Sequence, residues 1–367
     1  MIKQVFKDKF AGIALVILLF MYLCIVLANF IAHYSKDFSD RSQSYAPPSP
    51  IYMIDENGHL SKPYTYNYIR VFEPNLYQNI YKLDRSQKHY LQLFAKGEKY
   101  NLLGLIPTSR HLIGTSDGGR LYLLGTDING RDVFSRLLFG GRISLTIGFL
   151  ALFILFPIGL LYGGISGYLG GWVDILMMRF AEAIMAIPSF YLLIILASIL
   201  PANMTSIQRF TLIVIILALI GWAGFARVVR GMVLSIKNEE FVQAAETIGA
   251  SKLRVILKHI LPQTTSYVII AMTLSVPSYI LSESGLSFLG LGIQQPDASW
   301  GNMLKEAQEY VNILYRPWLL TPGVLIFIAV LCFNLVGDTV RDILDPKGKI
   351  RKFILDENMQ GLNQLKN

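Results

Sequence analysis

The chain has 367 residues, of which 53% are hydrophobic and only 16% are charged. Soluble domains usually carry about 25% charged residues, so this composition excludes an ordinary soluble protein and indicates one that crosses a membrane several times. The net charge of +8 does not indicate nucleic-acid binding, because the basic residues gather beside apolar runs, as the positive-inside rule predicts. Cys24 and Cys332 both lie inside apolar runs, so no disulfide framework is expected.

The chain opens with three lysines, Lys3, Lys7 and Lys9, around the start of an apolar run over 10–32. This run is too long for the hydrophobic region of a cleaved signal peptide, and no small-residue cleavage site follows it. We therefore expect 1–33 to hold a cytoplasmic N-terminus and a first transmembrane helix.

The stretch 34–123 is polar and rich in tyrosine and proline, which is typical of a segment outside the membrane. Within it, the sequence Asp-Glu-Asn-Gly at 55–58 lies between apolar residues and predicts a hairpin turn. We expect an extracytoplasmic insertion with some β-structure. Its histidines, His59, His89 and His111, match no metal-ligand spacing, so surface histidines are favoured over a metal site.

A polar motif at 124–142 precedes the second apolar span. Asp127, Asn129 and Asp132 surround Gly130 and faintly suggest a calcium loop. The full twelve-residue pattern with its closing glutamate is absent, so an Asx-type turn is the better interpretation.

Five further apolar spans are expected, at about 143–162, 173–200, 210–229, 263–291 and 318–336. A glycine-rich inner turn should follow the second span; its glycines are Gly163, Gly164, Gly167, Gly170 and Gly171. In the third span Arg179 and Glu182 are spaced for an ion pair, and Pro188 should kink the helix.

The loop after the fourth span carries six Lys or Arg residues between Arg227 and Lys258, whereas the preceding loop carries only Arg209. This asymmetry places the later loop in the cytoplasm. The basic tail at 347–367 should lie on the same side, against anionic headgroups. Glu283 is the one charge within the fifth span, and it is either a pathway residue or a carboxylate bonded to neighbouring helices or a subunit interface.

Residues 238–263, between the fourth and fifth spans, predict two amphipathic helices of about ten residues each. The apolar face of the first consists of Phe241, Ala244, Ala245 and Ile248. The second repeats it with Leu253, Ile256, Leu257 and Ile260. Gly249 is expected to adopt positive φ at the break, Ser251 to cap the second helix, and Pro262 to end or kink it.

This segment resembles the EAA loop in the membrane subunits of bacterial ABC importers. That loop reads Glu-Ala-Ala, three residues, Gly, and a hydrophobic stretch ending in Leu-Pro. The matching positions are Gln243, Ala244, Ala245, Gly249, Leu261 and Pro262, with Gln243 in place of the glutamate. The resemblance implies that 238–263 docks on an ATP-binding subunit and transmits its closure to the membrane helices.

The motif before the second span resembles that of permeases in the peptide and nickel importer group. The matching residues are Gly125, Thr126, Asp127, Gly130, Arg131, Asp132, Ser135, Arg136, Gly140, Arg142, Ser144 and Leu145. Similar matches follow at 286–292, at Trp300 and Gly301, and in the ending from Asn334 to Asp345 and Pro346.

The resemblance implies an all-α polytopic protein of the bacterial inner membrane, with six transmembrane helices of the type I ABC importer kind, an insertion after helix 1, and both termini in the cytoplasm. Residues 124–346 would form the permease core. Its implied partners are a homologous permease, two ATP-binding subunits, an extracytoplasmic substrate-binding protein and the lipid bilayer. No cofactor and no catalysis are expected in this chain, because no phosphate-binding G-x-x-x-x-G-K-[ST] loop is present.

The implied function is ATP-driven import of oligopeptides or dipeptides by alternating access. Import of nickel or another small solute is the alternative within the same group. A stand-alone secondary transporter would need more ionisable groups within its spans than Glu283. A membrane enzyme would need a motif such as H-E-x-x-H or paired intramembrane aspartates, and the spans contain neither.

Overall fold

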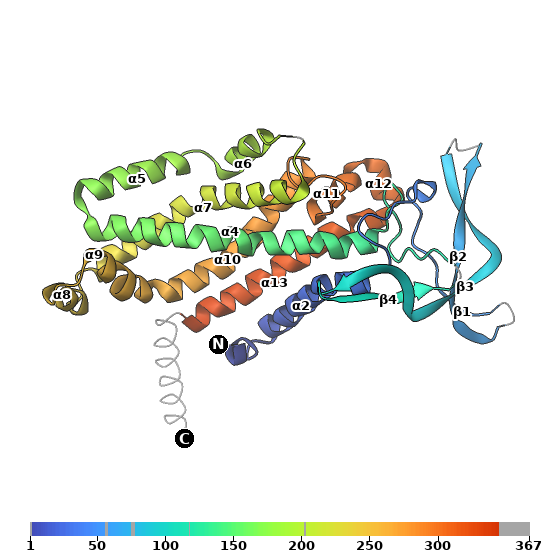
Figure 1. Ribbon diagram of the computed structural model, residues 1–367, viewed down its shortest axis with the longest axis horizontal. Helices are drawn as coiled ribbons and strands as arrows, with labels where there is room; N and C mark the ends of the chain where they lie inside the picture. The colour runs from blue at the N-terminus through green and yellow to red at the C-terminus, as the bar shows by residue number, and fades with distance from the viewer. Residues whose placement is uncertain (1, 56–57, 75–77, 117, 202, 345–367) are drawn as a thin grey trace, which may run out of the picture.

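The computed structural model describes residues 2–55, 58–74, 78–116, 118–201 and 203–344, and in it a helical bundle and an antiparallel sheet follow one another along the long axis (Figure 1). Asp345, Pro346 and the tail at 347–367 lie outside the described residues. The helices of the bundle are α1 (Ile2–Val5), α2 (Lys9–Val26), α3 (Ala28–Ile31), α4 (Val133–Leu169), α5 (Gly171–Met185), α6 (Ser189–Ser198), α7 (Ser206–Ile236), α8 (Glu240–Thr247), α9 (Lys252–Arg254), α10 (Thr265–Phe288), α11 (Trp300–Leu304), α12 (Tyr310–Tyr315) and α13 (Thr321–Leu344).

Within the described residues, five helical segments are long and apolar enough to cross a membrane, and the bent pair α5–α6 makes a sixth if it is one span. The expectation of six apolar spans agrees with the count obtained when α5 and α6 are taken as one span. The helices extend beyond the expected boundaries: α4 has 37 residues and α7 has 31. Hydropathy marks only the apolar centre of a helix, whereas Asp132 and Thr205 cap these two helices well before their apolar runs begin.

The third span is bent at Pro188, as predicted. α5 and α6 meet there at an angle of 76°. Proline lacks the N–H group needed to continue the helical hydrogen bonds, and its ring clashes with the preceding turn. The predicted ion pair is also present, with Arg179 Nη1 3.0 Å from Glu182 Oε2 on the exposed side of α5.

The glycine-rich inner turn is shorter than expected, because most of its glycines lie inside α4. A β-carbon on Gly163 would come within 2.3 Å of the Ala226 carbonyl oxygen, and one on Gly167 within 2.8 Å of that of Arg230. These glycines therefore let the backbones of α4 and α7 approach closely. Only Gly170 and Gly171 form the turn, with φ of +63° and +57°.

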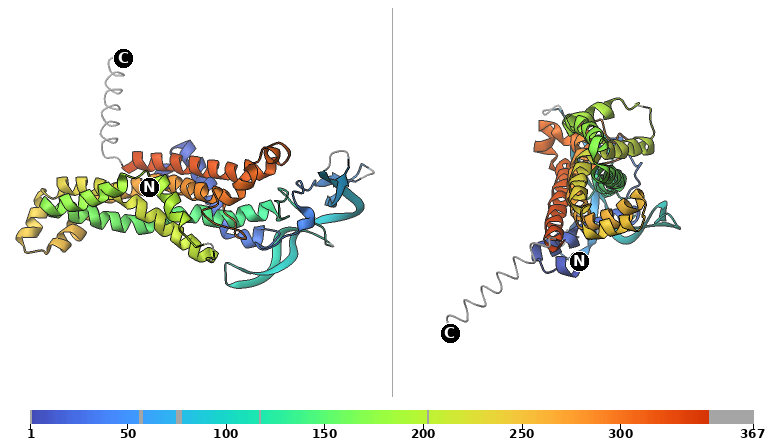
Figure 2. Two further views of the ribbon diagram at one scale, coloured as in Figure 1. Left: turned by 90° about the horizontal axis from the view of Figure 1, so that it is seen from above. Right: turned by 90° about the vertical axis from the view of Figure 1, so that its left-hand side faces the viewer.

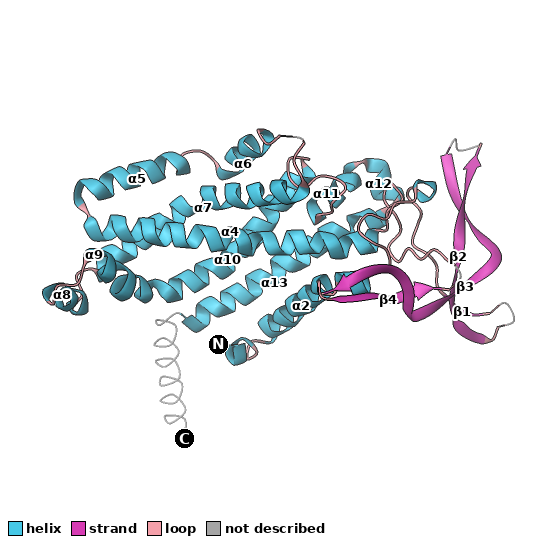
Figure 3. Ribbon diagram, in the orientation of Figure 1, coloured by secondary structure: helices cyan, strands magenta, loops and turns pink. Residues whose placement is uncertain are grey.

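The insertion folds as a four-stranded antiparallel sheet in the order β1-β2-β3-β4 (Figure 3). Its strands are β1 (Tyr52–Ile54), β2 (Leu60–Glu73), β3 (Gln78–Leu102) and β4 (Ile106–Thr115). The expected hairpin is confirmed, because Ile54 pairs with Leu60 and Asp55 N donates to His59 O at 2.8 Å. His111 and His89 are buried rather than on the surface. Figures 1 and 2 place the sheet and α8 at opposite ends of the bundle, here named the sheet end and the α8 end.

Candidate functional site

At the α8 end, α8 leads into a tight turn and then into one continuous helical segment. Gly249 has φ of +82°, as predicted, and Ala250 N donates to Ala245 O at 3.1 Å to close the turn. Ser251 occupies the N-cap position but makes no side-chain capping bond. The prediction of a second separate helix is wrong. α9 continues through a π-helical stretch (Val255–Ile260) and a 3-10 turn (Leu261–Thr264) into α10, so Pro262 neither ends the element nor separates it from the fifth span.

The predicted apolar face of this segment divides into a buried part and an outward part. Val242, Ala245, Val255, Ile256 and Ile260 are buried against the bundle. Four large apolar side chains instead point outward, with Ile248 as much as 84% exposed; the others are Phe241, Leu253 and Leu257. We name these four the α8 apolar surface. A helical period of 3.6 cannot distinguish these two sides when apolar residues cover both.

The EAA-like residues lie around this surface. Gln243 and Ala244 are exposed, and Gln243 Nε2 donates to Asn238 O at 3.1 Å. Leu261 packs near Gly164 of α4, and Pro262 faces outward in the 3-10 turn.

Polar contacts hold the α8 end to the bundle. Tyr168 Oη of α4 donates to Glu246 Oε1 of α8 at 2.5 Å. Arg230 Nε of α7 donates at 2.9 Å to Asp174 of α5, which also accepts a 2.5 Å bond from Ser166 of α4. Sequence reasoning did not find the Asp174–Arg230 pair, because its members are 56 residues apart and no motif links them.

At the sheet end, the motif before α4 forms an Asx turn. Asp127 Oδ1 accepts bonds from Asn129 N at 2.8 Å and Arg131 N at 3.0 Å. Gly130 has φ of +69°, and a β-carbon there would come within 1.8 Å of the Asp40 carbonyl oxygen. The interpretation as an Asx turn is therefore confirmed. Within the described residues, no group of three His, Cys, Asp or Glu side chains is placed to hold a metal ion.

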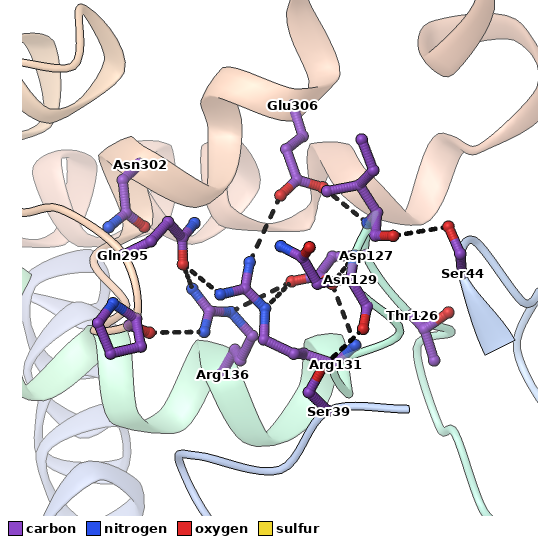
Figure 4. Close-up of polar contacts among 12 residues, drawn as sticks. Ser39, Ser44, Thr126, Asp127, Asn129, Arg131, Arg136, Gln295, Asn302 and Glu306 are labelled. Carbon is purple, nitrogen blue, oxygen red and sulfur yellow. Dashed lines mark hydrogen bonds and ion pairs between the residues drawn. The ribbon is translucent and has the colours of Figure 1, made fainter. Parts of the chain in front are cut away.

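Asp127 belongs to a charged group, named here the arginine cluster, whose members are Asp127, Arg131, Arg136, Gln295 and Glu306 (Figure 4). Asp127 and the two arginines are buried, Glu306 is partly buried, and Gln295 is exposed. Arg131 Nε lies 2.6 Å from Asp127 Oδ2, and Arg131 Nη2 lies 3.7 Å from Glu306 Oε1. Arg136 Nη1 and Nη2 donate to Pro296 O at 3.0 Å and to Gln295 Oε1 at 3.1 Å. The cluster therefore joins the start of α4 to the segment between α10 and α12.

Two carboxyl groups at this end resist ionisation. Burial raises the pKa of Asp132 to about 7, although its Oδ2 accepts bonds from Ser135 N at 2.8 Å and Oγ at 2.6 Å. Burial, and then the charge of Asp127, raise the pKa of Glu306 to about 7 despite the two neighbouring arginines. Glu306 and Gln295 were not predicted as site residues, since nothing in the sequence connects them with a motif about 170 residues earlier.

The remaining candidates have structural partners. Arg142 Nε donates to Ile25 O at 2.7 Å and its Nη1 to Asn29 Oδ1 at 3.0 Å, so it binds the end of α2 to α4. Gly125 has φ of +70° beside Trp318. Glu283 is fully buried and accepts bonds from Ser144 Oγ at 2.9 Å and Ser287 Oγ at 2.6 Å. This geometry favours a carboxylate bonded to neighbouring helices.

A helical bundle with up to six candidate spans among the described residues defines a polytopic membrane protein. Residues 136–350 match the family described as "Binding-protein-dependent transport system inner membrane component", and residues 1–48 match the "N-terminal TM domain of oligopeptide transport permease C". The chain belongs to the first of these families, and it is therefore a membrane-spanning permease of a binding-protein-dependent transport system.

Named relatives are similar over about three fifths of this chain. The oligopeptide transport system permease protein OppC of Haemophilus influenzae is 44% identical over 229 residues, which are 62% of this chain and 71% of that protein. The dipeptide transport system permease protein DppC of Bacillus subtilis is 45% identical over 225 residues, 61% of this chain and 68% of the relative. A solved chain of the MetNI methionine ABC transporter aligns with 56% of this chain and 94% of its own length, at 19% identity and a TM-score of 0.40.

Proposed function

We propose that this permease, together with a homologous second permease, forms the pathway of an ATP-driven importer of oligopeptides or dipeptides. The peptide assignment is supported by the OppC and DppC relatives at 44% and 45% identity. Separate subunits would hydrolyse ATP, and a soluble protein would deliver the substrate. The observation that carries the proposal is the α8 apolar surface, because a membrane protein has no internal reason to expose such a patch beyond its spans.

The α8 apolar surface is the proposed docking site for the ATP-binding subunit. Phe241 lies on α8, Ile248 directly follows α8, Leu253 lies on α9, and Leu257 lies on the π-helical stretch that continues into α10. A push on α8 would therefore pass into a membrane-spanning helix without an intervening flexible loop. The contacts of Glu246 and Leu261 with α4 would carry the same displacement to a second span. Gln243, Ala244, Ala245, Gly249 and Pro262 would shape this coupling segment rather than perform chemistry.

In this proposal the α8 end lies in the cytoplasm, and the sheet of the 34–123 insertion lies outside it, where a substrate-binding protein docks. Arg227, Arg230 and Lys237 at the α8 end of α7 support this orientation in a bacterial inner membrane. The permease core at 124–346 would then separate the two partner surfaces.

The coupling proposal is tested with Ile248→Glu in the assembled transporter. A charge at this 84% exposed position leaves the packing of the chain intact but opposes burial in a partner groove. We expect normal insertion of the permease, loss of the co-purifying ATP-binding subunit, and loss of ATP-dependent uptake. Leu60→Glu, at a 90% exposed position in the sheet, is the matched control and should retain both. Unchanged ATPase binding in Ile248→Glu would refute the docking site.

The substrate class is tested separately, by uptake of labelled oligopeptide and labelled nickel in cells that lack only this chain. Loss of peptide uptake that the intact gene restores would support the proposal. Loss of nickel uptake alone would keep the importer architecture and overturn the peptide assignment.

A further inference from the structure

The turn that joins β3 to β4 combines backbone strain with exposed apolar side chains. Its two central residues, Leu103 and Gly104, have φ of +52° and +76°, and Leu105 N donates to Leu102 O at 3.1 Å. Turns of this kind favour asparagine, aspartate or glycine at positive φ, because a branched apolar side chain is strained there. Leucine at position 103 therefore indicates that its side chain is needed for something other than the turn itself.

The side chains at this tip have no partner surface in the described part of the chain. Leu105 is 84% exposed, and Leu103 and Ile106 are each 59% exposed. Together they form an apolar tip on the hairpin, and Leu93 and Phe94 are also exposed further along β3. Exposed apolar side chains grouped in this way are expected of a surface that meets an apolar phase.

The hairpin runs from the sheet back toward the membrane-spanning helices (Figure 1). His111 Nδ1 lies 2.6 Å from the carbonyl oxygen of Ala32, after the end of α3. Nearer the tip, Asn101 O accepts a 3.5 Å bond from Asn29 Nδ2, at the start of α3. The hairpin thus descends alongside α3 toward α2, and its apolar tip lies beyond Asn101.

The end of α2 marks where the bilayer begins. The outward side of α2 is apolar and exposed at Leu19, Leu23 and Val26, and α2 is one of the helices that can span a membrane. At its end, Arg142 and Asn29 form a polar contact of 3.0 Å. The contact between Asn29 and Asn101 therefore places the tip of the hairpin close to the end of α2, whose outward side is apolar.

Basic side chains lie behind the tip. Lys96 and Arg110 are directly opposite each other on β3 and β4, and both are exposed. Like charges at such positions repel each other unless an anion lies between them. Lys99 lines a surface hollow with Tyr100, Asn101, Pro107, Thr108 and Ser109. Glu98 is an acidic residue between Lys96 and Lys99 on β3. Phosphate headgroups supply the anions at this level of a bilayer.

We propose that the tip of the β3–β4 hairpin inserts into the bilayer leaflet at the sheet end, with lipid phosphates bound at Lys96, Lys99 and Arg110. The proposal rests on α2 crossing the membrane and is independent of the transported substrate. Insertion would fix the sheet in position against the bundle, so that a protein docking on the sheet would meet a surface of defined height above the membrane.

The test is site-directed spin labelling of the full chain, purified with its partner subunits and reconstituted into nanodiscs of phosphatidylethanolamine and phosphatidylglycerol. Cys24 and Cys332 are first replaced by alanine, and a single cysteine is introduced as Leu105→Cys or, as the control, Leu60→Cys in the sheet far from the bundle. For each label we compare the rate of collision with oxygen with the rate of collision with a water-soluble nickel chelate. We expect the ratio of oxygen to chelate collisions to be several-fold higher at position 105 than at position 60. Equal ratios, or shielding from both relaxants by protein, would overturn the proposal.

A second comparison separates insertion from folding of the hairpin. Leu103→Asn suits positive φ better than leucine, so with Ile106→Thr it removes apolar side chains while the turn is retained. The label at position 105 should then become more accessible to the nickel chelate. An unchanged oxygen preference would show that the tip does not enter the bilayer through these side chains. Replacing Lys96, Lys99 and Arg110 together by glutamine should reduce the insertion depth if these side chains bind lipid phosphates, and an unchanged depth would remove the phosphate part of the proposal.

Discussion

At the residue scale, the arginine cluster concentrates charge at a largely buried site, because Asp127, Arg131 and Arg136 are all buried. Arg131 is 6% exposed and lies against Asp127, Gln295 and Glu306, which come from different parts of the chain. Burying charge is costly, and it is tolerated here because each arginine meets a carboxylate and an amide or carbonyl oxygen. The cluster therefore specifies how the start of α4 meets the segment after α10.

The first prediction concerns removal of one charge from this cluster. Arg131→Ala should destabilise the protein by about 3–5 kcal/mol, because Arg136 alone would then face both Asp127 and Glu306, and one largely buried carboxylate would lose its partner. The measurement is denaturant unfolding in detergent. The control is Arg120→Ala, which removes an exposed ion pair of 2.7 Å with Asp40 at the same end and should cost about 0–1 kcal/mol. If both variants lose the same free energy of unfolding, burial does not make the Arg131 ion pairs more important than the Arg120 pair.

The second prediction concerns pH. Burial raises the pKa of Asp132 from 3.8 to about 7, so the folded state binds this proton more tightly than the unfolded state. The stability from this group is full below pH 3.8 and is lost as the pH rises toward about 7. Asp132→Asn preserves an N-cap acceptor and should flatten this decline, with a residual slope from Glu306.

Asp132→Ala separates the titration from the cap. Relative to Asp132→Asn, which also does not titrate, it should lose about 0.5–2 kcal/mol at every pH, because alanine cannot accept the Ser135 N–H bond. The thermal unfolding midpoint of both variants across this pH range gives the comparison. A decline of unchanged slope in Asp132→Asn would mean that another group titrates.

At the element scale, the sequence predicted what depends on local pattern and missed what depends on packing. Apolar runs located the spans, Pro188 located the bend, and Asp127 with Gly130 located the Asx turn. The outward orientation of Ile248 and the pairing of Arg131 with Glu306 depend on contacts between distant segments. Gly163 was misassigned to a turn, because glycine marks both turns and close helix contacts and only the neighbouring helix distinguishes them.

The third prediction tests that helix contact. Gly163→Ala would bring a β-carbon within 2.3 Å of the Ala226 carbonyl oxygen, so α4 and α7 must separate. Such overpacking typically costs about 1–3 kcal/mol. Gly231→Ala on α7 is the matched control, because no atom lies within 4 Å of its β-carbon. It should be neutral or stabilising by up to about 1 kcal/mol, since alanine favours the helix. Greater destabilisation by Gly231→Ala than by Gly163→Ala in a thermal unfolding assay would contradict the packing.

At the scale of the whole molecule, the α8 apolar surface and the arginine cluster lie at opposite ends of the same helices (Figure 1). α4, α7 and α10 extend toward both ends, so a displacement at α8 can reach the arginine cluster through packed helices (Figure 1). Glu306 and Gln295 follow α10, whereas Arg131 and Arg136 lie at the start of α4. The cluster thus links the start of α4 to the segment that follows α10.

The fourth prediction follows from this arrangement and concerns orientation. With Cys24 and Cys332 replaced by alanine, single cysteines are introduced at Leu60, in the sheet, and at Ile248, beside α8; both positions are more than four-fifths exposed, at 90% and 84%. A membrane-impermeant maleimide should label Leu60→Cys in intact spheroplasts and Ile248→Cys only after permeabilisation, because the basic residues near α8 favour the cytoplasmic side. If both cysteines are labelled in intact spheroplasts, the two ends do not lie on opposite sides of a membrane. If the order is reversed, the span assignment remains but the proposed docking of ATP-binding subunits at α8 is excluded, since ATP is supplied from the cytoplasm.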